Sequence, residues 1–125
     1  MIKKLILSLV LAISCNAYAE TFKAGSKAVI SGVVVTPTAD ASITSDEKPH
    51  KYWALQLFRP INVMGDPKSD LNSSFHLGIM LIQLAPSPEQ FNYIKAHLGK
   101  KVTLSCKELF EADNGNHFTD VLCLM

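Results

Sequence analysis

One change of hydrophobic period constrains the fold of this chain more than any other feature. Between residues 28 and 84 the apolar residues alternate or form short β-branched runs, which is typical of β-strands. After Ser87 the period lengthens, and Phe91, Ile94 and Leu98 fall on one stripe of a helix. The strand pattern then returns. The sequence therefore predicts a mainly β domain that contains one helix.

Five segments carry the strand pattern, and their order limits the fold further. Gly32 in the first segment predicts a bulge or a sharp bend, as at a barrel corner. Pro60 is expected to interrupt the second strand, with residues 61–64 able to continue extended. Three strands, a helix and two strands is the order of the OB-fold, a small five-stranded Greek-key barrel. We therefore expect an OB-like five-stranded barrel of order β-β-β-α-β-β. The expected strands are residues 28–36, 52–58, 75–84, 101–110 and 117–125.

The expected helix has clear start and stop signals. Ser87 is a typical N-cap, Pro88 suits the first helical position, and Gln90 completes a capping box. Gly99 ends the helical pattern. We expect a helix over residues 88–98 that closes one end of the barrel with its apolar stripe.

The first nineteen residues have the three parts of a secretory signal peptide. A cationic start with Lys3 and Lys4 precedes an apolar run over residues 5–13, and Ala17 and Ala19 form a small-x-small cleavage signal. The apolar run is too short to span a bilayer, and no later run reaches that length. We expect residues 1–19 to be a signal peptide and residues 20–125 to be a single periplasmic or secreted domain.

Cysteine usage fits export. Cys15 could serve as a lipoprotein acylation site, but Leu11 stands four positions before it where three would be expected, so a soluble protein is favoured over a lipid-anchored one. If Cys15 leaves with the signal peptide, Cys106 and Cys123 remain and predict one disulfide in an oxidising compartment.

The last two expected strands predict a register for that disulfide. Asn114 and Gly115 form a strong hairpin signal between them. A hairpin that places Cys106 opposite Cys123 also places Phe110 opposite Thr119 across a short turn. The cystine and the hairpin therefore favour the same pairing.

The charge balance argues against a nucleic-acid partner. Of twelve basic residues, two are Lys3 and Lys4 of the leader, so ten remain against eleven acidic ones. No basic stripe is present in the sequence to bind a phosphate backbone. Export also argues against most nucleotide-driven chemistry.

Several short motifs of residues 52–124 resemble a bacterial family of secreted domains catalogued as domain of unknown function 4431. The motifs are Tyr52-Trp53-Ala54-Leu55-Gln56-Leu57, Pro60-Ile61-Asn62-Val63, Ile82-Gln83-Leu84, Gly99-Lys100-Lys101-Val102, Leu109-Phe110-Glu111-Ala112 and Gly115-Asn116-His117-Phe118-Thr119-Asp120-Val121-Leu122. The family's last motif is more often Thr-Gly-His-His-x-Thr. This chain keeps Gly115, His117 and Thr119, but Asn114 stands in place of the first Thr and Asn116 in place of the first His. The resemblance implies an exported domain and carries no assigned activity.

Two residues of the second expected strand are candidates for a binding surface. Tyr52 and Gln56 lie on the face opposite Trp53, and OB barrels bind ligands on the face of their second and third strands. Together with Asn116 and His117 of the last hairpin, they are the predicted partner-binding residues.

The last hairpin also collects possible metal ligands. Glu111, Asp113, His117 and Asp120 can be interpreted as a weak cation or substrate site, or as a solvated polar turn. Their spacing matches no recognised ligand motif, and no complete nucleophile–base pair occurs in the sequence. We therefore predict no catalytic residue, no metal site and no cofactor.

These features favour a small exported binding domain without catalysis. Its expected partner is a protein, peptide or glycan in the cell envelope or outside the cell, as for an inhibitor of a secreted enzyme or an immunity protein against a toxin. Two alternatives remain open: a self-assembling receptor-binding subunit of OB type, and a metal-dependent enzyme centred on His117. The sequence leaves open the partner's identity, the oligomeric state and the choice between periplasm and exterior.

Overall fold

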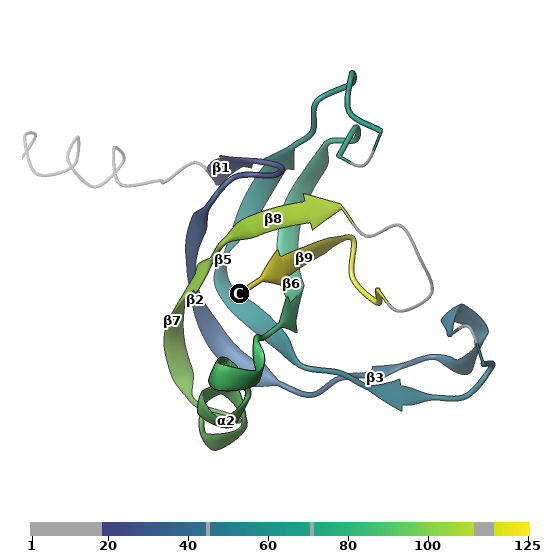
Figure 1. Cartoon of the computed structure of the whole chain (residues 1–125), viewed down its shortest axis with the longest axis vertical. Coiled ribbons are helices and arrows are strands. Elements are labelled where there is room, and N and C mark those ends of the chain that lie inside the picture. The colour runs from purple at the N-terminus through teal and green to yellow at the C-terminus, as the bar shows by residue number, and fades with distance from the viewer. Residues whose placement is uncertain (1–18, 45, 71, 112–116) are drawn as a thin grey trace, which may run out of the picture.

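The computed structural model describes residues 19–125 except for residues 45, 71 and 112–116. This part of the chain is mainly β, with a single α-helix and a short 3-10 turn (Figure 1). Its elements are β1 (Glu20–Lys23), β2 (Ala28–Val35), β3 (Thr38–Ala39), the 3-10 turn η2 (Ala41–Ile43), β4 (His50–Lys51), β5 (Ala54–Met64), β6 (His76–Ala85), α2 (Pro88–Ala96), β7 (Lys101–Cys106), β8 (Glu108–Glu111) and β9 (Val121–Leu124).

The main sheet curls into a half-barrel. Its strand order is β7-β2-β5-β6-β9-β8, and β1 adds to β5 as a parallel partner. The β6–β9 pair is also parallel, whereas the other pairs on this path are antiparallel. The two end strands, β7 and β8, are separated in the chain by Lys107 alone, so the sheet must bend back on itself to place both. β3 and β4 form a separate two-stranded sheet that extends away from the half-barrel (Figure 1).

The mainly β fold with one helix is confirmed, but the expected division into five strands is not. The segment expected as one strand over residues 101–110 is divided at Lys107 into β7 and β8. The stretch between the first two expected strands contains β3 and β4, and β1 precedes β2, so nine strands are present in the described chain. Local hydrophobic pattern located the long strands but could not show where pairing partners change.

Pro60 lies at an interruption in the pairing of the second long strand, but the strand itself does not end there. β5 continues through Pro60 to Met64, and the proline is exposed. The register between β5 and β6 shifts between Gln56 and Ile61, so the irregularity accommodates a residue that has no N–H to donate.

Gly32 lies where β2 is held between two partners. It pairs with Leu57 of β5 and with Val102 of β7. A Cβ at this position would lie 2.2 Å from the backbone oxygen of Gln56, so no larger residue fits without moving β5. Glycine is therefore required for the close approach of the two strands.

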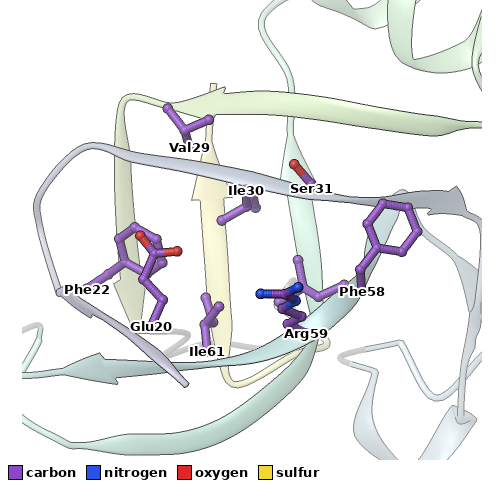
Figure 2. A pocket seen from close by; sticks show the side chains of 9 residues that line it. Glu20, Phe22, Val29, Ile30, Ser31, Phe58, Arg59 and Ile61 are labelled. Carbon is purple, nitrogen blue, oxygen red and sulfur yellow. The ribbon is translucent and has the colours of Figure 1, made fainter. Parts of the chain in front are cut away.

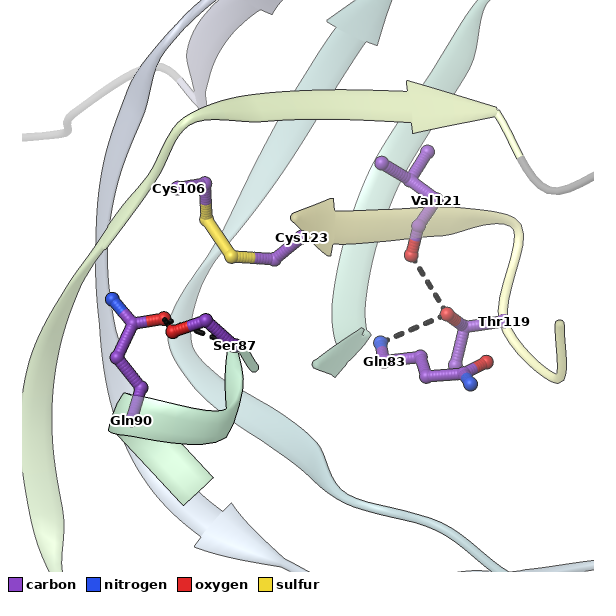
Figure 3. Close-up of a disulfide and its surroundings, with 7 residues drawn as sticks. All are labelled: Gln83, Ser87, Gln90, Cys106, Thr119, Val121 and Cys123. Atoms are coloured by element: carbon purple, nitrogen blue, oxygen red, sulfur yellow. Dashed lines mark hydrogen bonds between the residues drawn. A yellow bond between two sulfur atoms is a disulfide. The ribbon is translucent and has the colours of Figure 1, made fainter. Parts of the chain in front are cut away.

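The disulfide prediction is confirmed, but the predicted register is wrong. Cys106 and Cys123 are fully buried and bonded, with their Cα atoms 5.3 Å apart (Figure 3). Cys123 lies opposite Leu109 of β8, and Cys106 pairs with Ala28 of β2. The bridge therefore crosses the interior between β7 and β9, which are not neighbours in the sheet. The hairpin signal at residues 114–115 lies outside the described residues.

The register is different because Thr119 does not take part in the β8–β9 ladder. Phe110 pairs with Leu122 instead. The Thr119 hydroxyl donates to the carbonyl of Val121 at 2.7 Å and accepts from the amide of Gln83 at 2.9 Å. These bonds turn the chain just before β9 begins.

The helix begins as expected, but it buries less than its stripe suggested. The amide and the hydroxyl of Ser87 both donate to Gln90 Oε1, at 3.2 and 2.8 Å (Figure 3). Ile94 is fully buried in the core. Phe91 is 41% exposed and packs edge-on against Trp53, with 6.0 Å between ring centroids, and Leu98 is also exposed. The expected buried stripe is therefore wrong for two of its three residues.

The core lies inside the curl of the main sheet. Its largest fully buried side chains come from β5, β6, α2 and β8, and include Leu55, Ile82, Ile94 and Leu109. The alternating burial of β7 leaves Val102, Leu104 and Cys106 inside. No helix of the described residues is long and apolar enough to cross a membrane.

Because Ile94 is buried and Phe91 is partly exposed, their alanine variants should lose different amounts of unfolding free energy. Ile94→Ala should lower the free energy of unfolding by about 2–5 kcal/mol, since it leaves a cavity in a closed core. Phe91→Ala should cost clearly less, because much of its ring is already in water. Urea unfolding of both variants measures the difference. An equal or larger loss in Phe91→Ala would contradict this packing.

Removal of the disulfide should also destabilise the protein. Cys123→Ala should lower the free energy of unfolding by about 3 kcal/mol, because the bridge closes a chain segment with a separation of 17 residues. Urea unfolding of the oxidised protein, with reduced wild type as the control, measures this loss. Peptide mapping without reductant should link the two cysteines, and free thiols on both in folded protein would contradict the structure.

Candidate functional site

The segment between β2 and β5 folds into an arm, defined here as residues 37–51. Hydrogen bonds connect several of its described residues. The Thr44 hydroxyl contacts the carbonyls of Ala41 and Lys48 at 3.1 and 2.7 Å. Near the arm's return, Nε2 of His50 lies 2.7 and 2.8 Å from the two carboxylate oxygens of Asp46. This contact with His50 holds the pKa of Asp46 below its usual value.

The base of the arm meets the segment that precedes β9. The ring of Tyr52 packs against Phe118 with 5.1 Å between centroids, and His50 stacks on the same ring at 6.4 Å. Tyr52 and Phe118 are both partly buried, and burial raises the pKa of the Tyr52 phenol. Two segments far apart in the chain therefore form one aromatic surface.

Gln83 of β6 holds Phe118 in this position. Its side-chain Oε1 accepts a hydrogen bond from the backbone amide of Phe118 at 2.7 Å, while its backbone amide donates to Thr119 Oγ1 at 2.9 Å. Figure 3 shows Gln83 and Thr119 side by side, with the Thr119 hydroxyl also bonded to Val121. We call these bonds the Gln83 clamp. It fixes the aromatic ring to the central sheet through backbone and side-chain contacts.

The structure brings together some of the predicted site residues. Tyr52 lies in the aromatic surface, and Gln56 is exposed on β5, where its Nε2 donates to the carbonyl of Met80 at 3.2 Å. His117 directly precedes Phe118, but its ring packs edge-on against Phe110, 5.8 Å away. Asn116 lies outside the described residues.

Sequence reasoning missed His50, Phe118 and Gln83. The alternating hydrophobic pattern could assign each residue to a strand face or a loop, but it could not show which distant segment each residue contacts. The aromatic residues at the arm base and before β9 were a usable signal. Their contact depends on the curl of the sheet, which the local pattern does not specify.

Of the acidic residues around the last turn, Glu111 contacts Ser74 and His76. Glu111 Oε2 accepts the amide of Ser74 at 3.0 Å and lies 3.7 Å from His76 Nε2. The Ser74 amide is the main cause that lowers the pKa of Glu111. Asp113 lies outside the described residues. In the part of the chain that the structure describes, no group of three or more His, Cys, Asp or Glu side chains is arranged to hold a metal ion.

A pocket of about 210 Å³ lies between β1, β2 and β5 (Figure 2). Its floor is apolar and includes the buried Ile30 and Ile61. Arg59 and the half-exposed ring of Phe58 stand at its rim, and Lys101 Nζ is 5.9 Å from the centre of that ring.

A second concavity adjoins the aromatic surface. This groove has a volume of about 400 Å³ and lies along one edge of β6. Residues 77–81 of β6 form one side, and Phe118, Thr119 and Asp120 form the other. The Gln83 clamp therefore shapes the groove as well as the aromatic surface.

Comparison with known proteins gives a family-model match to the C-terminal part of the chain. Residues 81–124 match the family model described as Domain of unknown function (DUF4431). The match includes Gln83, Phe118 and the two cysteines of the disulfide, whereas the arm and β5 precede it in the chain. Searches of curated proteins and of solved structures found no significant match.

Proposed function

We propose that this protein is a small exported binding domain without catalytic activity. Its partner would dock on the surface formed by Tyr52, Gln56, Phe118 and His117. The observation that carries this proposal is the contact of Tyr52 with Phe118, 5.1 Å between ring centroids, which joins two segments into one surface. Tyrosine is a common interface anchor because its ring offers area and its hydroxyl offers a directional bond.

The scaffold supports the same assignment, and we place it in the OB-fold class. With β7 and β8 counted as one strand bent at Lys107, the order of long strands agrees with that class, and α2 follows the third of them. OB barrels bind ligands on the face of their second and third strands and with the loops after their first and fourth. The arm and the Phe118 segment occupy those two loop positions.

Export is part of the proposal. The leader pattern over residues 1–19 supports cleavage after Ala19, and a buried disulfide fits an extracellular or periplasmic protein. The near balance of acidic and basic residues after residue 19 favours a protein, peptide or glycan over a nucleic acid. We propose inhibition of a secreted enzyme or immunity against a toxin as its use.

Substitution at the aromatic surface tests the proposal. The tagged protein should capture a partner from the native cell envelope, and Tyr52→Ala should weaken that capture at least about tenfold, as the loss of an interface anchor does. Tyr93→Ala is the matched control, because Tyr93 is 46% exposed on α2 and its ring stacks on His97. It should bind as wild type does.

Two results would contradict the proposal in different ways. If Tyr52→Ala and His117→Ala both bind as wild type does, with unchanged melting temperatures, the partner docks elsewhere. If the purified protein shows metal-dependent hydrolysis that disappears in His117→Ala, the protein is an enzyme. A stable ring-shaped oligomer that buries Tyr52 would instead support the self-assembling subunit.

A further inference from the structure

One edge of β6 is paired over only part of its length. β5 pairs with β6 on one side from His76 to Gln83. On the other side, β9 pairs only with residues 83–85. Within the described ranges, no strand continues this pairing along residues 77–82. The groove beside the Gln83 clamp lies along this free edge.

The hydrogen-bond pattern shows which backbone groups face the groove. In an antiparallel pair, alternate residues direct both their N–H and C=O toward the same neighbour. The amide of Leu84 donates to Trp53 beside β5, while the amide of Gln83 donates away from β5 to Thr119 Oγ1. By this alternation, the N–H and C=O of Leu81 point into the groove. The Thr119 hydroxyl occupies the position where the next strand residue would bond.

The walls of the groove suit an extended chain with apolar side chains. Leu77 is 72% exposed and Met80 is 39% exposed, and Phe118 lines the opposite side. Residues 77–81 contain no proline and no charged residue, two of the devices by which proteins protect a sheet edge. Gly78 has a φ of +68° and bends the strand, so the straight part of the edge is short.

The charge of the groove specifies its occupant further. Asp120, an exposed carboxylate, is the charged residue among those that line it. No basic side chain is among these residues. A partner segment with a lysine or arginine would therefore gain a favourable contact at this end, whereas an acidic segment would be repelled.

We propose that this edge of β6 binds a short extended peptide segment of the partner protein. The segment adds a strand beside β6 through the N–H and C=O of Leu81, packs apolar side chains on Met80 and Phe118, and places a Lys or Arg near Asp120. This mode of recognition gives affinity through main-chain bonds and specificity through alternate side chains. The inference rests on the proposed function, because it names the partner's chemistry beside the surface that Phe118 shares.

Backbone-methylated peptides test the strand pairing directly. The probe is the acetylated and amidated peptide Lys-Val-Thr-Val-Thr-Val, titrated into the full-length oxidised protein and followed by amide NMR shifts. The amide signals of residues 79–81 should shift on addition of the peptide. Two further peptides carry N-methyl groups on the valines or on the threonines. Since alternate residues face β6, one of them should bind at least about tenfold more weakly and the other as the parent does.

Side-chain variants test the walls and the charge. Met80→Lys should abolish peptide binding, whereas Val29→Lys, at a residue 61% exposed on β2, should leave it unchanged. Asp120→Asn should weaken the lysine peptide but leave a glutamine-substituted peptide unaffected. Equal binding of both methylated peptides, or no shift at Leu81 with any peptide, would overturn the proposal.

The outcomes separate this inference from the proposed function. A captured partner that is lost in Tyr52→Ala but retained in Met80→Lys would overturn the strand pairing and leave the binding domain standing. A dimer that forms with rising concentration and disappears in Met80→Lys would show that a second copy occupies the edge, which also overturns the proposal.

Discussion

The buried Cys106–Cys123 bridge lies where the curled sheet closes on itself. Cys106 lies beside β2, and Cys123 lies between β6 and β8. β7 continues through Lys107 into β8, the Lys107 amide donates to the carbonyl of Leu124 at 2.6 Å, and β8 pairs with β9. The covalent link across the interior ties β7 to β9 at this closure and restricts the unfolded chain. In a domain of this size such a constraint supplies stability that a small core alone does not readily provide.

The candidate site depends on the same closure. β9 is a short strand, and the bridge fixes it against β7 while Gln83 and Thr119 fix the residues just before it. Phe118 is thereby held at the point where the arm returns to the body of the domain, and Tyr52 completes the contact. The shape of the surface follows from the barrel's curvature together with a few polar bonds.

Local features of the fold could be predicted from the sequence. The capping box at Ser87 located the start of α2 because the signal and the structure lie within one turn. The strand expected over residues 28–36 agrees with β2 to within one residue at its end. The cysteine count gave the disulfide partners, since two cysteines in the expected mature chain allow one pairing.

Features that depend on distant segments could not be predicted. The register of β8 and β9 follows from the Thr119–Gln83 bond, which joins residues the local pattern treats separately. Phe91 has the helical spacing of a core residue, but Trp53 stands between it and the interior. For the site, Tyr52 could be chosen from its face on the strand, whereas Phe118 became a candidate only through a contact formed on closure.

The central claim is that the arm base and the segment before β9 form one surface in solution. Nuclear Overhauser contacts between ring protons of Tyr52 and Phe118 test it most directly, with the Trp53–Phe91 ring pair as the internal reference. The account predicts contacts within both pairs. It also predicts slow hydrogen exchange of the Phe118 amide, because this amide donates a hydrogen bond to Gln83 Oε1. Contacts within the Trp53–Phe91 pair alone, with a rapidly exchanging Phe118 amide, would contradict it.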